Sequence, residues 1–426
     1  MRYLLYTETF PSRVPDSPRQ TGIGRYCYDL ADGLRQLGHA VEVLTNDAIG
    51  PSAGADAPEP FPVELLGAPV GSRADMLRRA ARVARAVHRR APDAVIVGDP
   101  LANDVYALAA DVVGRPYCPV YYGTELAALA APVAARRSAV ARGSAWLRGR
   151  YVARARLPVS ISRYTAGLLR AAMPSSAESV IVYPCVAESL LRRPVNAGAR
   201  AALLARIGAR TSDPCVLVTV ARISERKNQM GVLRALARLR ADGVDAHYVI
   251  VGNVDAADHD GYSAELQRFI AANDLARVVT VVSNATDAEK ADLLDGSDVF
   301  VMVSRPSGAS VEGFGISPIE AACRGKPAIV STHGGMPETV VDGETGFVLD
   351  ADDAEALAGV VRSLARDPAR RARMGAAGRE FTRRHFTPSA VAATLHRRLA
   401  ARPDPMPSTE RPRGLPIERS PRTQEP

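Results

Sequence analysis

Two separate series of short apolar runs, alternating with amphipathic segments, constrain the fold of this chain more than any other feature. The short runs are typical of buried strands, and the segments between them repeat their apolar residues with a helical period. Strands that alternate with helices form parallel sheets whose two faces are covered by helices. We therefore predict an α/β protein with two doubly wound, Rossmann-like domains facing a central cleft.

The segments that we expect to be strands are apolar and are bounded by turn residues. Those of the first series are YLLYTETF, AVEVLT, DAVIVGD, YCPVYYGTE, LPVSIS and SVIVYP. Those of the second series are CVLVTVA, AHYVIVG, VVTVVS, DVFVMVS, PAIVST and GFVLD. Ligands of such sheets bind outside the carboxyl ends of the strands, so we look for a site there.

The chain is too long for one ordinary core, because its 426 residues exceed the usual size of a single domain. The strand pattern is lost between the two series, where the chain becomes rich in Arg and Ala. We expect an N-terminal domain (1–186), a linker (187–212), a C-terminal domain (213–384), a helix that packs back on the N-terminal domain (385–401) and a disordered tail (402–426).

Composition excludes several classes of protein. The net charge is +8, but only three of the 54 basic residues are lysines, which indicates codon bias from a GC-rich genome. No nucleic-acid-binding motif accompanies the charge, so we expect no nucleic-acid partner. The five cysteines are scattered without metal spacing, which suits a reducing compartment. No signal peptide or long apolar run is found, and we expect a cytoplasmic protein.

The stretch TGIGRYCYDL follows the first expected strand and contains Gly22 and Gly24. It fails the dinucleotide fingerprint, because Cys27 stands where the third glycine belongs, and no P-loop motif occurs in the chain. A glycine loop that brings backbone N–H groups to an anion at a helix N-terminus is one interpretation. A plain turn before a helix is the other, and this stretch alone leaves both open.

The stretch SVEGFGISPIEA is the most informative one. Gly313 and Gly315 flank Phe314 just before an expected helix, whose first N–H groups have no partner within the helix. Glu312 and Glu320 bracket this point, and carboxylates accept hydrogen bonds from sugar hydroxyls. The arrangement suits a nucleotide sugar, with amides for the diphosphate and one acid each for ribose and hexose. Two solvated glutamates are the alternative.

The stretch VARISERKN follows the first strand of the second series. Arg222 and Lys227 of this stretch can converge on a diphosphate and neutralise the charge that develops on a leaving group. The alternative is a basic surface loop.

As a set, these motifs resemble those of the retaining GT-B-fold glycosyltransferases of family 4, the glycosyl transferases group 1. The resemblance spans roughly Met1 to Asp350 and keeps the order of the family. It rests on TGIGRY, YYGTEL, VSISRYTAGLL, VARISERKN, EGFGISPIEA and GGMPETVVDGETGFV. It implies transfer of a hexose from a UDP- or GDP-linked donor to a hydroxyl acceptor, with the N-terminal domain on the acceptor side and the C-terminal domain binding the donor.

The resemblance also assigns roles to particular residues. Arg222 and Lys227 would bind the diphosphate, and Glu312 would contact the transferred sugar. The other donor-binding residues would be Gly22, Tyr122, Phe314, Gly315, Ile316 and Glu320. Two positions depart from the family, which commonly has a histidine at Tyr122 and a glycine at Thr21.

Similar enzymes retain the anomeric configuration without a demonstrated protein nucleophile, and they need no cofactor besides the donor. We expect no metal site, and we interpret Asp350 and Asp352 as helix-capping residues. A sugar-nucleotide epimerase and a nucleotide-sugar-binding protein without transfer activity are the competing functions. Asp99 and Asn103 either touch the acceptor or cap a helix.

Two basic stretches of the first series, SRADMLRRAARVARAVHRRAP and ARRSAVARGSAWLRGRYVARARL, have two interpretations. They can lie on an anionic membrane, at its inner face, or they can form solvated helix faces. We favour the solvated faces and keep peripheral membrane contact as the alternative.

Overall fold

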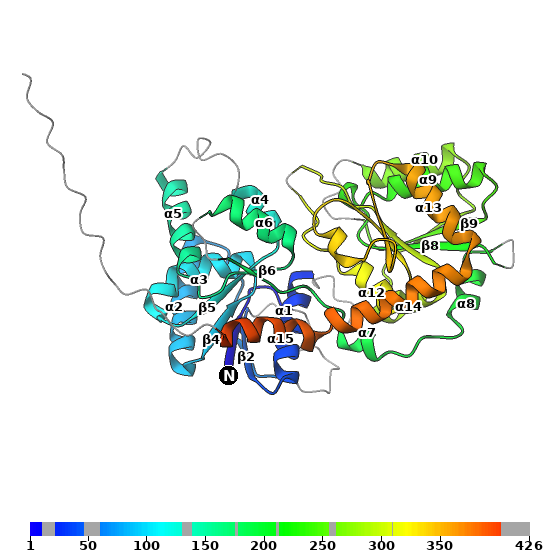
Figure 1. The fold of residues 1–426 in the computed structure, drawn as a ribbon. Helices are drawn as coiled ribbons and strands as arrows, with labels where there is room; N and C mark the ends of the chain where they lie inside the picture. Colours follow the sequence, from blue (N-terminus) through cyan, green and yellow to red (C-terminus); the bar gives the residue numbers. More distant parts are fainter. Residues whose placement is uncertain are drawn as a thin grey trace, which may run out of the picture.

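Two parallel sheets, each flanked by helices, form the framework of the computed structural model (Figure 1). The structure describes residues 1–10, 22–46, 60–129, 139–174, 178–209, 213–254, 261–308 and 310–401. The predicted fold class is confirmed. The predicted tail (402–426) lies outside the described residues.

The first sheet has seven strands in the order β3-β2-β1-β4-β5-β6-β7. They are β1 (Arg2–Tyr6), β2 (Ala40–Thr45), β3 (Val63–Leu65), β4 (Ala94–Val97), β5 (Tyr117–Tyr121), β6 (Val159–Ser160) and β7 (Val180–Ile181). All pairings are parallel, with Leu5 opposite Val43 on one side and Ile96 on the other. The short strand β3 was not predicted, because its sequence has only three residues of strand and lies at the sheet edge.

The second sheet has six strands in the order β10-β9-β8-β11-β12-β13. They are β8 (Cys215–Val220), β9 (Ala246–Val251), β10 (Val279–Val282), β11 (Val299–Met302), β12 (Ala328–Ser331) and β13 (Gly346–Leu349). The strand order reverses at β8, whose neighbours are β9 and β11. Such a reversal opens a crevice at the carboxyl ends of the two central strands.

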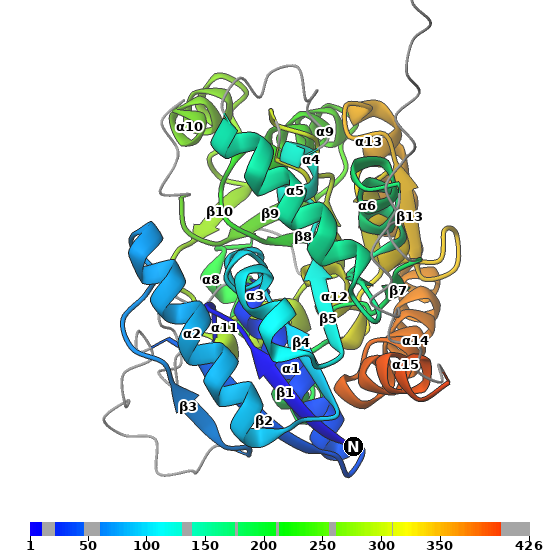
Figure 2. The ribbon, with the colours of Figure 1, turned by 90° about the vertical axis from the view of Figure 1, so that its left-hand side faces the viewer.

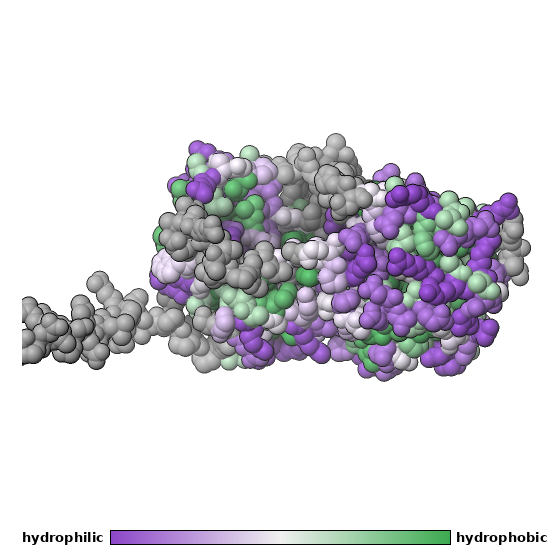
Figure 3. Space-filling view, turned by 90° about the horizontal axis from the view of Figure 1, so that it is seen from above, coloured by the Kyte–Doolittle hydropathy of each residue, from purple (hydrophilic) through white to green (hydrophobic). Residues whose placement is uncertain are grey.

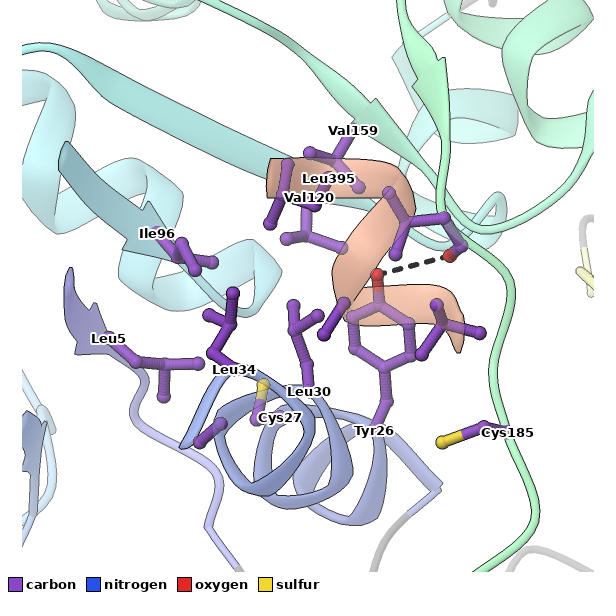
Figure 4. Packing of buried hydrophobic residues seen from close by; sticks show 14 of the residues in the cluster. Leu5, Tyr26, Cys27, Leu30, Leu34, Ile96, Val120, Val159, Cys185 and Leu395 are labelled. Atoms are coloured by element: carbon purple, nitrogen blue, oxygen red, sulfur yellow. Dashed lines mark hydrogen bonds between the residues drawn. The ribbon is translucent and has the colours of Figure 1, made fainter. Parts of the chain in front are cut away.

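Helices cover both faces of the first sheet. One face packs against α1 (Gly22–Gln36) and α15 (Pro388–Ala400), where Leu30, Leu34 and Leu395 meet strand residues (Figure 4). In the same cluster the Tyr26 hydroxyl donates to the Val182 carbonyl oxygen at 3.1 Å. The other face packs against α2 (Arg73–Arg90), α3 (Pro100–Val113) and α5 (Ala139–Ala153), which lie in front in Figure 2. Two further helices are α4 (Thr124–Leu129) and α6 (Arg163–Ala172).

The second sheet is covered in the same way. Apolar residues of α9 (Gln229–Ala241), α10 (Tyr262–Ala272) and α13 (Ala354–Arg366) form one cluster with the strands. The opposite face packs against α8 (Ala199–Arg206), α11 (Asp287–Gly296) and part of α12 (Ser317–Cys323). Helix α14 (Pro368–His385) runs along this domain and leads into α15, which reaches the other domain (Figure 1).

The predicted linker (187–212) contains regular structure rather than only irregular chain. It includes α7 (Glu188–Arg192) and α8, and α8 packs against α11 of the second sheet. The side chain of buried Arg324 donates hydrogen bonds to the carbonyl oxygens of Arg193 and Pro194 in this segment. The same side chain forms an ion pair with Asp295 at 2.6 Å. The domain boundaries, including this linker, stay predictions.

The two domains touch through main-chain and side-chain contacts. The Ser162 hydroxyl donates to the Gly313 carbonyl oxygen at 2.6 Å. Glu338 lies in a short 3₁₀ turn (Met336–Thr339) and accepts hydrogen bonds from the backbone N–H groups of Arg163 and Tyr164, at 2.9 and 3.1 Å. Helix α6 has its own N-cap, Ser162, which accepts from Thr165 N–H, and a carboxylate of the other domain adds a second cap at the same helix end.

Seen from above, hydrophilic residues predominate over the C-terminal domain, with apolar residues among them (Figure 3). None of the helices in the described ranges is long and apolar enough to cross a membrane.

Candidate functional site

A buried cluster of charges lies where β8 and β11 end. One carboxylate oxygen of Glu312, Oε2, accepts a hydrogen bond from Lys227 Nζ at 2.6 Å and another from Arg226 Nη1. The side chains of Glu312, Lys227 and Arg226 are only 13%, 12% and 17% exposed. The structure thus brings together Lys227 and Glu312, which are 85 residues apart in the sequence.

The loop after β8 is shaped to present Lys227. A 3₁₀ turn (Glu225–Lys227) ends at Asn228, whose backbone has a positive φ of 52°. The buried Asn228 amide donates to the carbonyl oxygens of Val303 and Ala351, and its side-chain oxygen caps α9 by accepting from Gly231 N–H. Asparagine tolerates this conformation better than most residues. The turn is therefore anchored to the neighbouring strand ends.

The electrostatics of the cluster favour ionised groups. Burial raises the pKa of Glu312, but the positive charges of Lys227, Arg226 and Arg222 outweigh burial and hold it below its ordinary value. Burial lowers the pKa of Lys227, an effect that Glu312 opposes. Arg222 lies exposed at the start of the same loop, and its carbonyl oxygen accepts from the Gln229 side chain at 3.0 Å.

The stretch after Glu312 presents main-chain donors. The backbone N–H groups of Phe314, Gly315 and Ile316 have no hydrogen-bond acceptor within the part of the chain that the structure describes. Gly315 has a φ of 91°, a conformation in which side chains are strained. Helix α12 begins at Ser317, so these three residues directly precede it.

The Phe314 side chain points away from these donors. It is buried at the domain junction, with ring centroids 5.3 Å from Tyr183 and 5.6 Å from Phe386. The family assignment of Phe314 therefore concerns its backbone alone.

Glu320 lies in the first turn of α12 and is half-buried. Burial raises its pKa to about 6, and the nearby Arg25 of α1 opposes the shift. Arg25 itself donates to Asp29 at 2.9 Å. The N-terminal domain thus places a cation close to the carboxylate that the sequence analysis assigned to ribose.

The remaining predicted residues come from the N-terminal domain. Gly22 is the first residue of α1 and is exposed, so it belongs to the helix start rather than to a loop, while Thr21 lies outside the described residues. The Tyr122 hydroxyl donates to the Gly98 carbonyl oxygen. This bond uses the phenolic hydrogen, so a sugar hydroxyl would have to donate to the Tyr122 oxygen.

Glycines allow a close approach of backbone at the site, across the domain junction at Gly313 and within the C-terminal domain at Gly334. A Cβ atom on Gly313 would lie 2.1 Å from the Tyr122 carbonyl oxygen, and one on Gly334 would lie 2.1 Å from the Glu312 carbonyl oxygen. Such distances are far below any normal contact. These positions therefore require glycine for the close approach that the structure has.

A pocket of about 230 Å³ adjoins Glu312. Tyr164 of the N-terminal domain closes one side, and Arg305 and His333 of the C-terminal domain line the other. Arg226, Arg25, Glu338 and His333 were not among the residues predicted from the sequence. The adjacency of Arg226 to Lys227 in ERKN was the one signal that could have marked it.

The other candidates have structural roles. Asp99 caps α3 by accepting from Ala102 N–H at 2.7 Å, and Asn103 donates to the Val120 carbonyl oxygen at 3.0 Å. Asp353 caps α13 by accepting from Ala356 N–H, whereas Asp350 accepts from Asp352 N–H, so the capping expected of Asp350 and Asp352 falls to their neighbour. No group of three or more His, Cys, Asp or Glu residues suited to a metal occurs in the described ranges.

Several arginines of the basic stretches are paired within the protein. Arg148 forms two hydrogen bonds of 2.7 Å with Asp104, and Arg150 and Arg154 pair with Asp111 of α3. Trp146 of α5 is 67% exposed. Arg136 and Arg137 lie outside the described residues, and membrane contact stays a prediction.

Comparisons with known proteins find a family match for each half of the chain. Residues 204–381 match the family described as glycosyl transferases group 1, and residues 21–185 match the glycosyl transferase 4-like domain. The fold resembles that of Anabaena HepE in complex with UDP, with a TM-score of 0.73, 18% identity, and coverage of 94% of this chain and all of that one. Sucrose-phosphate synthase from Thermosynechococcus elongatus gives a TM-score of 0.71 at 20% identity, again over 94% of this chain and all of the other.

Curated relatives are similar over part of their length. A GDP-mannose-dependent α-(1-6)-phosphatidylinositol monomannoside mannosyltransferase of Mycolicibacterium smegmatis is 37% identical over 225 residues, which are 52% of this chain and 56% of that protein. The human α-1,3/1,6-mannosyltransferase ALG2 is 29% identical over 189 residues, 43% of this chain and 44% of that protein. The chain spans about half the length of the curated relatives it matches.

Proposed function

Because the chain belongs to the glycosyl transferases group 1 family of GT-B-fold proteins, we propose that it is a retaining mannosyltransferase that uses GDP-mannose and a hydroxyl acceptor. The observation that carries the proposal is the convergence of Lys227, Glu312 and the unpaired N–H groups of residues 314–316 at the strand ends that face the other domain. The choice of mannose and GDP is supported by the relatives that depend on GDP-mannose.

In this proposal, different residues bind different parts of the donor. Lys227 and Arg222 neutralise the diphosphate, the N–H groups of residues 314–316 serve phosphate and sugar, and Glu320 accepts hydrogen bonds from ribose hydroxyls. Glu312 holds a hydroxyl of the transferred hexose. Gly22 and Tyr122 approach the donor from the N-terminal domain.

The reaction follows from this arrangement. The bond between the sugar C1 and the phosphate oxygen breaks, and negative charge grows on the diphosphate, where Lys227 and Arg222 stabilise it. The acceptor hydroxyl attacks C1 from the same face and passes its proton to the leaving phosphate oxygen. The protein positions charges and substrates rather than forming a covalent bond, and no metal takes part.

Binding and turnover together test the proposal. We would measure calorimetric binding of GDP, UDP, ADP and their hexose conjugates to the full chain with EDTA present, in wild type and Glu320→Ala. Selective binding of GDP-mannose, weakened by the substitution, is the expected result. The transfer product should keep the donor's anomeric configuration by NMR.

Lys227 provides a sharper test of the catalytic assignment. We expect Lys227→Ala to lower kcat by about 10²–10³, the cost of losing one preorganised donor to a developing charge. Arg240→Ala is the control, because Arg240 is an exposed cation of α9 paired with Asp274. Near-full turnover in Lys227→Ala, or binding of no nucleotide by the wild type, would overturn the proposal.

A further inference from the structure

Two cations share a single carboxylate oxygen at the candidate site, although the proposed function assigns a task to only one of them. Lys227 and Arg226 both donate to Oε2 of Glu312. Burial of the three side chains limits the water that could replace either donor. The second cation therefore needs a physical explanation.

The proposed function, on which this inference rests, draws Lys227 toward the diphosphate when the donor binds. An ammonium group has three hydrogens, and phosphate oxygens compete for them with Glu312. A buried carboxylate that loses its cation becomes costly to keep ionised and tends to take up a proton. Protonated Glu312 would hold a sugar hydroxyl less well and with a different hydrogen-bond pattern.

Arg226 is placed to remain on Glu312 while Lys227 is occupied. Its carbonyl oxygen accepts from the Arg305 N–H at 2.9 Å, which fixes the backbone of the 3₁₀ turn against the chain after β11. An arginine supplies a delocalised, planar cation that suits buried ion pairs. It approaches Glu312 from the same 3₁₀ turn as Lys227.

We propose that Arg226 is a positioning residue that keeps Glu312 ionised and oriented toward the transferred sugar while Lys227 neutralises the diphosphate. Arg226 does not itself touch the reacting atoms. The charged and titratable groups that face Glu312 are Lys227, Arg226 and Arg222 from the loop after β8. Arg305, His333 and Tyr164 face it across the adjoining pocket. Among these groups Arg226 is the permanent cation in direct contact with the carboxylate.

The first test is the pH dependence of turnover with GDP-mannose for wild type, Arg226→Ala and Arg226→Lys. We expect Arg226→Ala to lower kcat about 10²-fold at neutral pH, the cost of a misplaced catalytic group, with a small change in KM. The acid limb of the profile should move to higher pH, because Glu312 then protonates more readily. Arg226→Lys should recover most of the loss, since it restores a cation. Arg240→Ala, which removes an exposed ion pair with Asp274, is the control.

A second measurement is independent of turnover. We would titrate the Glu312 carboxyl carbon by NMR in the full chain labelled with ¹³C-glutamate, assigning its signal by its loss in Glu312→Gln. Arg226→Ala should raise the pKa of Glu312 above its wild-type value, and Arg226→Lys should raise it less. An unchanged pKa in Arg226→Ala would overturn the inference even if the wild type transfers mannose. A raised pKa with no transfer by the wild type would support the electrostatic role and locate the failure in the proposed function.

Discussion

Glu320 illustrates how burial at a single residue can make ligand binding depend on pH. Burial raises the pKa of its carboxyl to about 6, above the ordinary 4.5, and Arg25 offsets only part of this effect. Folding therefore favours the protonated form. The stability contributed by this group is present below about pH 4.5 and is lost as pH rises to about 6. Above that pH the carboxylate is ionised at a cost, which a ribose that donates two hydrogen bonds would offset.

The first prediction concerns this residue. We expect the affinity for GDP-mannose, whose diphosphate diester keeps its charge in this range, to fall as pH drops through about 6. Glu320→Gln should bind about ten- to hundredfold more weakly at pH 7, because hydrogen bonds to a charged group contribute about 1.5–3 kcal/mol. The affinity of Glu320→Gln for GDP-mannose should not change between pH 5 and 7. Calorimetry over this range checks both expectations.

The thermal stability of the protein without ligand provides the control for the Glu320→Gln substitution. Because the ionised carboxylate is costly to bury, Glu320→Gln should unfold at a temperature no lower than wild type at pH 8. A clearly lower unfolding temperature of Glu320→Gln at pH 8 would mean that the carboxylate stabilises the fold through a partner within the protein. That result would contradict the assignment of Glu320 to ribose binding.

At the scale of elements, the cap of α6 connects the two domains. Glu338 accepts hydrogen bonds from the first two N–H groups of the helix and from the Tyr183 hydroxyl at 2.9 Å. An anion at a helix N-terminus is favourable, and its removal leaves N–H groups without a partner. We expect Glu338→Ala to lower the free energy of unfolding by about 0.5–2 kcal/mol, the usual cost of removing a group that caps a helix N-terminus. Urea unfolding at pH 7 measures this.

The matched control is Glu344→Ala, because Glu344 is exposed on the loop that follows the same 3₁₀ turn. It should change stability by less than about 0.5 kcal/mol, as surface substitutions usually do. Equal stability of Glu338→Ala and Glu344→Ala would show that the contact between Glu338 and α6 is not maintained in solution.

Elements differ in how well the sequence predicts them. Strands such as VLVTV were predicted because hydrophobic periodicity is a local property. The cap of α6 was missed because its carboxylate lies 175 residues from the helix that it caps. Arg226 was missed for a related reason, since only the packing of β8 against β11 brings its guanidinium group to Glu312. Local pattern thus predicts elements and motif residues, whereas contacts between distant segments come from packing.

At the scale of the whole molecule, the domains are in contact at the site. The contact depends on the absence of side chains at Gly313, whose Cα faces the Tyr122 carbonyl oxygen and would not accommodate a Cβ atom. Rigid domains joined by a few segments respond to such a clash by hinge motion rather than by local compression. Separation at this point would also move Glu312 away from the N-terminal half of the site.

The prediction for the whole molecule is that Gly313→Ala opens the two domains. Spin labels on Val112→Cys of α3 and Val281→Cys of β10 report the separation, because both positions are exposed and all five native cysteines are buried. We expect a longer mean distance between the labels by pulsed electron paramagnetic resonance, and turnover reduced by about tenfold or more, since small displacements of catalytic groups are costly.

Gly359→Ala in α13 is the control, as a Cβ atom there meets nothing within 4 Å. It should leave the distance unchanged and stabilise the helix by about 0.5–1 kcal/mol. The same label distance in Gly313→Ala and wild type would mean that the closed contact is not what holds the two halves of the site together.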